Sequence, residues 1–164
     1  MRIIEGDLDD RRVAALLRHH VTTAAAQTAS GSAHALGIDR LRSSGIEFWT
    51  AWKADDLLGF GALKTLAKGH GEIKSMHVVE AQRRKGVGRA LLDHLIRRAR
   101  TKGMRQISLE TGSWGYFRAA QALYRSRGFV ECPPFGDYQP DRNSVFMTLD
   151  LQAPKALYST DLTA

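Results

Sequence analysis

Residues 72–89, EIKSMHVVEAQRRKGVGR, predict a strand, a turn with two glycines and the start of a helix. The first part of this stretch, Glu72 to Val79, carries apolar positions at close spacing and predicts a strand. A turn with two glycines follows, and then a helix is predicted from Gly86 to about Lys102, because valine and leucine side chains recur there every four residues. The turn therefore lies at the amino-terminal end of an amphipathic helix.

That turn has the chemistry of an anion-binding site. Glycine lets a backbone approach a ligand closely, and the free N–H groups of the first helical turn point outward. The positive end of the helix then favours a phosphate or pyrophosphate. The candidate cofactor-binding residues of this loop, four of them basic, are Arg83, Arg84, Lys85, Gly86, Val87, Gly88 and Arg89. A tight turn with solvated charges is the alternative that the residues leave open.

The segments on either side predict an α+β domain built on one central sheet. The expected order is β-α-α-β-β-β-α-β-α-β-β, in which three strands joined by short turns form an antiparallel meander. Residues 22–33 are small and polar, and they predict a loop or a weak helix. The strands are expected at 2–5, 46–52, 57–66, 72–79, 105–110, 129–130 and 143–151, and the helices at about 10–21, 34–42, 86–102 and 116–127.

Composition limits the class of protein. The 164 residues predict one domain, 1–151, with a C-terminal tail, 152–164, that shows no clear period. The formal net charge of +7 indicates an acidic partner such as nucleic acid, a membrane surface or a phosphorylated cofactor. A single cysteine, Cys132, excludes an internal disulfide, and we expect no metal site.

Other classes of partner find little support in the sequence. No secretory signal or apolar membrane span is visible, so we expect a cytoplasmic location and no membrane partner. No DNA-reading motif and no basic strand with interleaved aromatic residues occurs, so we expect no nucleic-acid partner. Excess positive charge that only aids solubility is the alternative that the composition leaves open.

Two motifs carry a resemblance to a known family. Arg83-x-x-Gly86-x-Gly88 matches the pattern [QR]-x-x-G-x-[GA], which is the pyrophosphate loop of the GCN5-related N-acetyltransferases. Ala120-x-x-Leu123-Tyr124-x-x-x-Gly128-Phe129 matches the late helix of the same family. The chain resembles this family over roughly residues 46–151. The resemblance implies the GNAT fold, an α+β architecture with a single mixed central sheet of about six to seven strands flanked by helices.

Within that family the sequence resembles small bacterial acetyltransferases of the YsnE type. The segments that suggest this are 34–36 (HAL), 109–113 (LETGS), 135–138 (FGDY) and 143–147 (NSVFM). Many family members have Asn at the start of the late helix, where it contacts the cofactor. Phe117 stands at that position here, so the resemblance does not imply this contact.

The resemblance implies direct acetyl transfer from acetyl-CoA to an amine within a ternary complex. Glu72 matches the catalytic glutamate of the histone acetyltransferase branch, and it would take the proton of an amine whose pKa is about 8–10. Tyr124 matches the general acid, which would protonate the leaving thiolate. The backbone of Met76, His77 and Val78 would hold the pantetheine arm and polarise the thioester carbonyl.

Each of these residues also has a purely structural interpretation. The alternative for Glu72 is an exposed charge at a strand end, and the alternative for Tyr124 is a tyrosine of the core. His77 is a second candidate for the base.

The acceptor site is expected near the N-terminal segment around His34 and the loop 133–143. In that loop, Asp137 and Tyr138 supply a carboxylate and a ring that can orient an ammonium group. Trp114, which precedes the late helix, is a further candidate. An ordinary hairpin connection with Asp137 in a turn is the alternative.

The predicted function is an acetyl-CoA-dependent N-acetyltransferase of a small amine or amino-acid-like metabolite. A protein or peptide N-acetyltransferase and a non-catalytic module that binds CoA or nucleic acid remain alternatives. The resemblance also allows a homodimer, because dimers are common in the family.

Overall fold

The computed structural model describes residues 1–32 and 34–152, so nearly all of the predicted tail lies outside the described residues. The helices and strands follow the predicted order, with two short 3₁₀ turns in addition. They are β1 (Arg2–Glu5), α1 (Arg11–Ala26), α2 (Ile38–Leu41), β2 (Ile46–Lys53), β3 (Asp56–Ala67), β4 (His70–Val78), η1 (Glu80–Gln82), α3 (Val87–Thr101), β5 (Gln106–Gly112), η2 (Gly115–Phe117), α4 (Arg118–Arg125), β6 (Val130–Glu131) and β7 (Ser144–Asp150).

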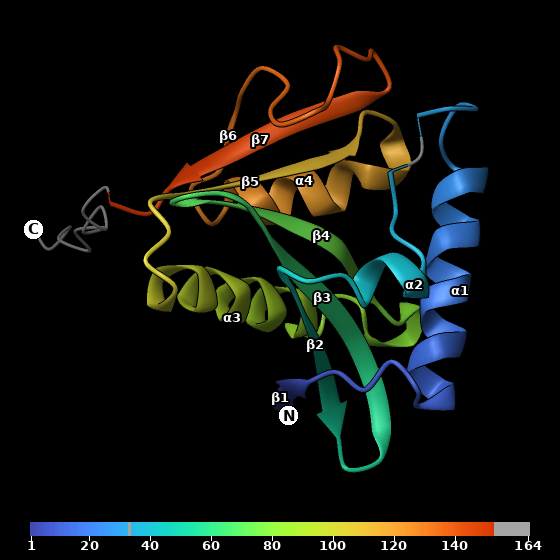
Figure 1. The fold of residues 1–164 in the computed structure, drawn as a ribbon. Coiled ribbons are helices and arrows are strands. Elements are labelled where there is room, and N and C mark those ends of the chain that lie inside the picture. The colour runs from blue at the N-terminus through green and yellow to red at the C-terminus, as the bar shows by residue number, and fades with distance from the viewer. Residues whose placement is uncertain (33, 153–164) are drawn as a thin grey trace, which may run out of the picture.

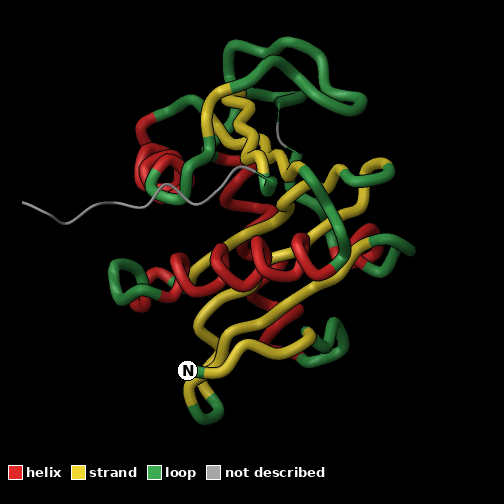
Figure 2. Tube along the Cα trace, turned by 90° about the vertical axis from the view of Figure 1, so that its left-hand side faces the viewer, coloured by secondary structure: helices red, strands yellow, loops and turns green. Residues whose placement is uncertain are grey.

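The strands form one mixed sheet in the order β1-β2-β3-β4-β5-β7-β6. Only the pair β4–β5 is parallel among the described pairs, and the other neighbours are antiparallel. In Figure 1, β5 and β7 run at a large angle to β2 and β3, and β4 lies between the two sets. Figure 2 shows helices on both faces of the sheet. The predicted α+β class and single mixed sheet are confirmed.

Each face of the sheet has its own core. On one face, α3 buries the periodic side chains Leu92 and Leu95 together with Ile107 and Leu109 of β5. On the other face, α1 buries Val13 and Leu17 against Phe48 and Phe60, as the apolar spacing of α1 predicts. In the described part of the chain, no helix has the length and apolar character needed to span a membrane.

The strands β4 and β5 separate halfway along their length. Their pairing ends at Ile73 and Leu109. Just beyond, the register between β3 and β4 shifts, and Ser75 adopts a left-handed backbone with φ of 50°. Such a bulge bends a strand. The end of β4 therefore stays with β3 and turns away from β5, which leaves one backbone edge of β4 unpaired.

Three predicted helix boundaries are wrong. The helix predicted at 34–42 is only α2, because Leu36 donates its N–H to Ser75 Oγ (3.3 Å) and Gly37 is extended. The segment 22–33 is helical as far as Ala26, since consecutive alanines are the best helix formers. The late helix begins at Arg118, and the residues before it form η2.

Candidate active site

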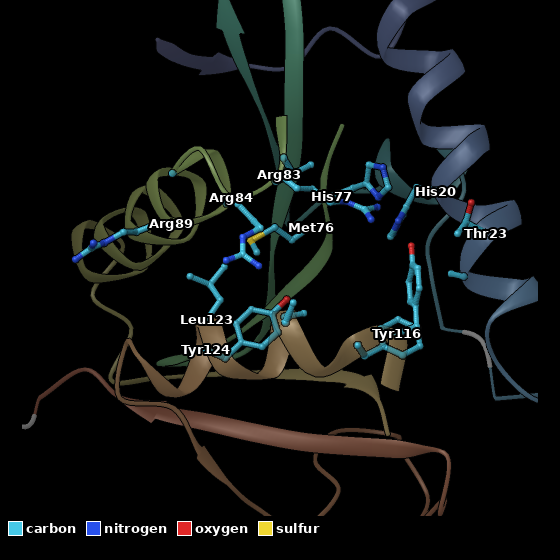
Figure 3. Close-up of a pocket in the computed structure, with 17 residues that line it drawn as sticks. His20, Thr23, Met76, His77, Arg83, Arg84, Arg89, Tyr116, Leu123 and Tyr124 are labelled. Atoms are coloured by element: carbon cyan, nitrogen blue, oxygen red, sulfur yellow. The ribbon is translucent and has the colours of Figure 1, made fainter. Parts of the chain in front are cut away.

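A cavity of about 540 Å³ opens where β4 separates from β5. Four parts of the chain form its walls: α1, the end of β4, the loop before α3, and the segment that includes η2 and α4 (Figure 3). The lining residues are His20, Thr23, Ala24, Met76, His77, Val78, Arg83, Arg84, Gly86, Gly88, Arg89, Tyr116, Phe117, Ala119, Ala120, Leu123 and Tyr124.

The loop before α3 has the backbone of an anion-binding site. Arg84 and Gly86 both have positive φ, 60° and 84°, and no side chain within the described chain caps the N-terminus of α3. The N–H groups of the first turn of α3 therefore stay available to a ligand, and the helix end adds positive potential. Of the seven predicted loop residues, Lys85 and Val87 do not line the cavity. Lys85 is exposed, and Val87 is buried under the sheet.

The unpaired edge of β4 forms the next wall. Met76, His77 and Val78 line the cavity, as predicted for a pantetheine-binding strand. On their other side, His77 and Val78 pair with Phe60 and Gly59 of β3. The His77 ring stacks on Phe60, with 5.7 Å between the ring centroids. The backbone edge that faces away from β3 is therefore available to a ligand that lies along it like an added strand.

Tyr124 of α4 lies at the cavity wall that faces β4 (Figure 3). The residue is 7% exposed. Burial raises its pKa to about 12, and the negative charge of Glu110 adds to this effect. The phenol therefore stays protonated at neutral pH and can donate a proton to a developing thiolate.

Glu72 is held in a buried polar cluster and does not line the cavity. It is 2% exposed, so the alternative of an exposed charge at a strand end is wrong. Its carboxylate accepts a hydrogen bond from the Tyr138 hydroxyl (2.7 Å) and lies 3.2 Å from Lys74 Nζ. Lys74 in turn donates to the Tyr138 hydroxyl (2.6 Å). These contacts join β4 to the loop 133–143.

A second carboxylate, Glu110, lies directly beyond Leu109, the last residue of β5 that pairs with β4. In the sequence, Glu110 stood out only as part of the segment 109–113 that resembles the family. Burial raises the pKa of Glu110, and this effect outweighs the hydrogen bond that its carboxylate accepts from Ser144 (2.7 Å). A carboxylate with a raised pKa, placed where two strands separate, is suited to accept a proton.

The geometry thus joins an anion-binding loop, an unpaired strand edge and a protonated tyrosine in one cavity. The sequence profile described as the Acetyltransferase (GNAT) family matches residues 15–129. The chain belongs to this family. It is an acetyltransferase whose co-substrate is acetyl-CoA, and its cavity fits that molecule because basic groups and N–H donors meet at one end.

Individual relatives agree with this assignment. The chain is 46% identical to the uncharacterized N-acetyltransferase YsnE of Bacillus subtilis over 92% of its length and all of that protein. It is 39% identical to the uncharacterized N-acetyltransferase YedL of Escherichia coli, covering 88% and 91% of the two chains. A Bacillus subtilis acetyltransferase solved in complex with CoA shares the fold, with a TM-score of 0.64, 22% identity, and 91% and 97% of the chains covered.

The predicted acceptor residues of this acetyltransferase are only partly brought together. The His34 ring packs edge-on against Tyr138 with 5.0 Å between centroids, so these two residues meet beside Glu72. Asp137 is exposed on its loop. Trp114 is 53% exposed and does not line the cavity. In the described part of the chain, no cluster of three or more His, Cys, Asp or Glu residues is placed to hold a metal ion.

The last turns of α1 contribute to the cavity, which was not predicted from the sequence. His20, Thr23 and Ala24 line the cavity from the last turns of this helix. The only signal was the pair His19-His20, in which one imidazole had to lie on the buried side of a helix. His20 packs against His77, with 5.0 Å between ring centroids, and against Phe60 at 5.5 Å.

These packed imidazoles predict an acid-sensitive fold. Burial is the main reason that the pKa of His20 falls to about 4. The unfolded chain binds this proton at a pKa of about 6.5, so the stabilising contribution is present above that pH and is lost as the pH falls toward 4. Between pH 7 and pH 5 we expect His20 alone to remove roughly 2 kcal/mol from the free energy of unfolding.

Urea denaturation of the wild type and of His20→Phe at both pH values measures this contribution. The variant keeps a ring at the same position and should lose less stability on acidification than the wild type. Equal losses in the two proteins would contradict the assignment to His20.

Proposed function

We propose that the chain transfers the acetyl group of acetyl-CoA directly to the amine of a small metabolite within a ternary complex. The observation that supports this most is one cavity that joins the phosphate-binding loop to Tyr124 across the unpaired edge of β4. Acetyl-CoA is a long molecule, and its binding requires protein contacts from the nucleotide end to the reacting thioester. A cytoplasmic location and a homodimer remain predictions of the same account.

Each wall of the cavity has a proposed role. Acetyl-CoA supplies a thioester, which is an activated acyl group. Arg83, Arg84, Arg89 and the N–H groups at the start of α3 bind its phosphates. The backbone of residues 76–78 holds the pantetheine arm and donates to the thioester carbonyl, which stabilises negative charge as it develops. Tyr124 protonates the leaving thiolate.

A carboxylate at the separation of β4 and β5 takes the proton from the amine through an intervening water, because neither Glu72 nor Glu110 lines the cavity. The sequence assigned this role to Glu72. We propose Glu110 as the general base, because its pKa is raised and, among the described residues, its carboxylate accepts a hydrogen bond from the neutral Ser144 hydroxyl. Glu72 is the second candidate, and its buried contacts with Tyr138 and Lys74 favour a role in positioning the loop 133–143.

Substitution of the tyrosine tests the general acid. Tyr124→Phe removes only the hydroxyl, so we expect kcat to fall by at least about tenfold while the urea midpoint stays close to that of the wild type. Because burial raises the pKa of Tyr124 to about 12, its ionisation should not limit the rate below about pH 11. Steady-state kinetics from pH 6 to pH 10 provides the measurement. A wild-type kcat in the variant would remove Tyr124 from the mechanism.

A screen of acceptors tests the proposed function as a whole. Thiol release from acetyl-CoA is followed in the presence of simple amines, amino acids or short peptides. We expect small amines to accelerate release most. Acceleration by peptides alone would identify a peptide acetyltransferase, and tight CoA binding without any acceleration would identify a non-catalytic module.

A further inference from the structure

The α1 side of the cavity is built mainly from rings. Figure 3 shows His20, His77 and Tyr116 around this side, and Arg84, Leu123 and Arg89 on the side of α3 and α4. His20, His77 and Phe60 pack mutually, with ring centroids 5.0–5.7 Å apart. These separations are those that aromatic rings prefer when they pack against one another. Tyr116 is 42% exposed, so its ring is accessible to a bound molecule.

This side of the cavity is uncharged at neutral pH. Burial lowers the pKa of His20 to about 4 and that of His77 to about 3, and the charge of Arg83 contributes to the second value. Among the described lining residues, the ionised side chains are arginines, and none is a carboxylate. A polyamine acceptor would carry a second positive charge into this cavity. That charge would be repelled by the arginines and would find no carboxylate among the described lining residues.

We propose that the acceptor amine is carried by an aromatic ring system that packs against His20, His77 and Tyr116. The inference rests on the proposed function and names its substrate class. A planar ring of the acceptor would pack against the neighbouring rings of His20 in α1 and His77 in β4. The hydroxyl group of Thr23, a lining residue, would offer a hydrogen bond that fixes the orientation of the amine. An acyclic or saturated body would bury comparable area without the ring–ring attraction.

Matched acceptors test the proposal. The acceptors 2-phenylethylamine and 2-cyclohexylethylamine present the same amine on rings of similar size, of which only one is aromatic. We expect kcat/KM for the phenyl compound to be about 3- to 10-fold higher. Spermidine serves as the polycationic comparison and should be the poorest of the three.

Substitutions of His20 and Tyr116 test whether these two rings cause the preference for an aromatic acceptor. His20→Ala and Tyr116→Ala should raise KM for 2-phenylethylamine by about 3- to 10-fold and leave KM for acetyl-CoA unchanged. His20→Phe and Tyr116→Phe keep a ring and should stay within about twofold of the wild type. Thr22→Ala is the matched control, because Thr22 is exposed on the same helix and does not line the cavity. Tyr116 is partly exposed, so its substitution should leave the fold intact. It therefore tests the packing of the acceptor even if variants at His20 do not fold.

The outcomes separate this inference from the proposed function. Equal or better turnover of the cyclohexyl compound, or a change in KM that is the same for both amines in Tyr116→Ala, would overturn the aromatic acceptor while leaving an N-acetyltransferase. Release of CoA that no amine accelerates would overturn both. A phenyl preference that disappears in Tyr116→Ala and persists in Tyr116→Phe supports the proposal.

Discussion

Replacing Gly88 by Glu should weaken acetyl-CoA binding by at least about 100-fold. Gly88 lines the cavity at the second residue of α3. A Cβ added there would lie 3.3 Å from Leu123 and 3.4 Å from Val78, so a longer side chain fills the space between α4 and β4. The carboxylate would also stand where phosphate is expected. A 100-fold loss corresponds to about 2.8 kcal/mol, a modest figure for steric block and charge repulsion together.

Calorimetry on a folded variant measures this loss. Lys85→Glu is the matched control, because it introduces the same side chain three residues away on an exposed position that does not line the cavity. It should weaken binding only slightly, and more so at low salt. Unchanged affinity in Gly88→Glu would refute the assignment of the loop, whereas an equal loss in both variants would indicate a general charge effect.

Glu110→Gln should lower kcat by about 10²–10⁴-fold near neutral pH, the usual range for loss of a general base. Glutamine keeps the size of the side chain and can still accept the hydrogen bond from Ser144. The rate should recover in part as the pH rises, because the amine then loses its proton to water. Measurement of kcat from pH 6 to pH 10 gives both results.

Glu72→Gln is the comparison that decides between the two carboxylates. The glutamine oxygen can still accept from the Tyr138 hydroxyl, so we expect a loss of less than about tenfold. A large loss confined to Glu72→Gln would restore the assignment made from the sequence. Losses below threefold in both variants would show that neither carboxylate takes the proton.

The parts of the site that lie close together in sequence were predictable. The strand, the glycine turn and α3 follow from local residue preferences, and the loop and the edge of β4 are placed as expected. Asp10 accepts the N–H of Arg12 (2.8 Å) and so caps the N-terminus of α1 through a contact between near neighbours in sequence. In each of these cases the interaction that fixes the structure connects residues only a few positions apart.

The parts that depend on distant contacts were not predictable. The partner of Glu72 is Tyr138, 66 residues further along the chain, and no local pattern announces a buried pair of this kind. The bulge at Ser75 places a left-handed residue where serine gives no signal for one. The last turns of α1 line the cavity, although threonine and alanine carry no amphipathic pattern that would reveal a buried face.

A single-turnover labelling experiment shows where the acetyl group goes when it leaves acetyl-CoA. Acetyl-CoA labelled in the acetyl group is mixed with the wild-type protein and the amine that most accelerates thiol release, and the label is followed by mass spectrometry within one turnover. The account predicts that the label passes to the amine as an amide, that none is found on the protein, and that Gly88→Glu transfers none. Label on the protein chain before the amide forms, or no labelled amide with any amine, would contradict it.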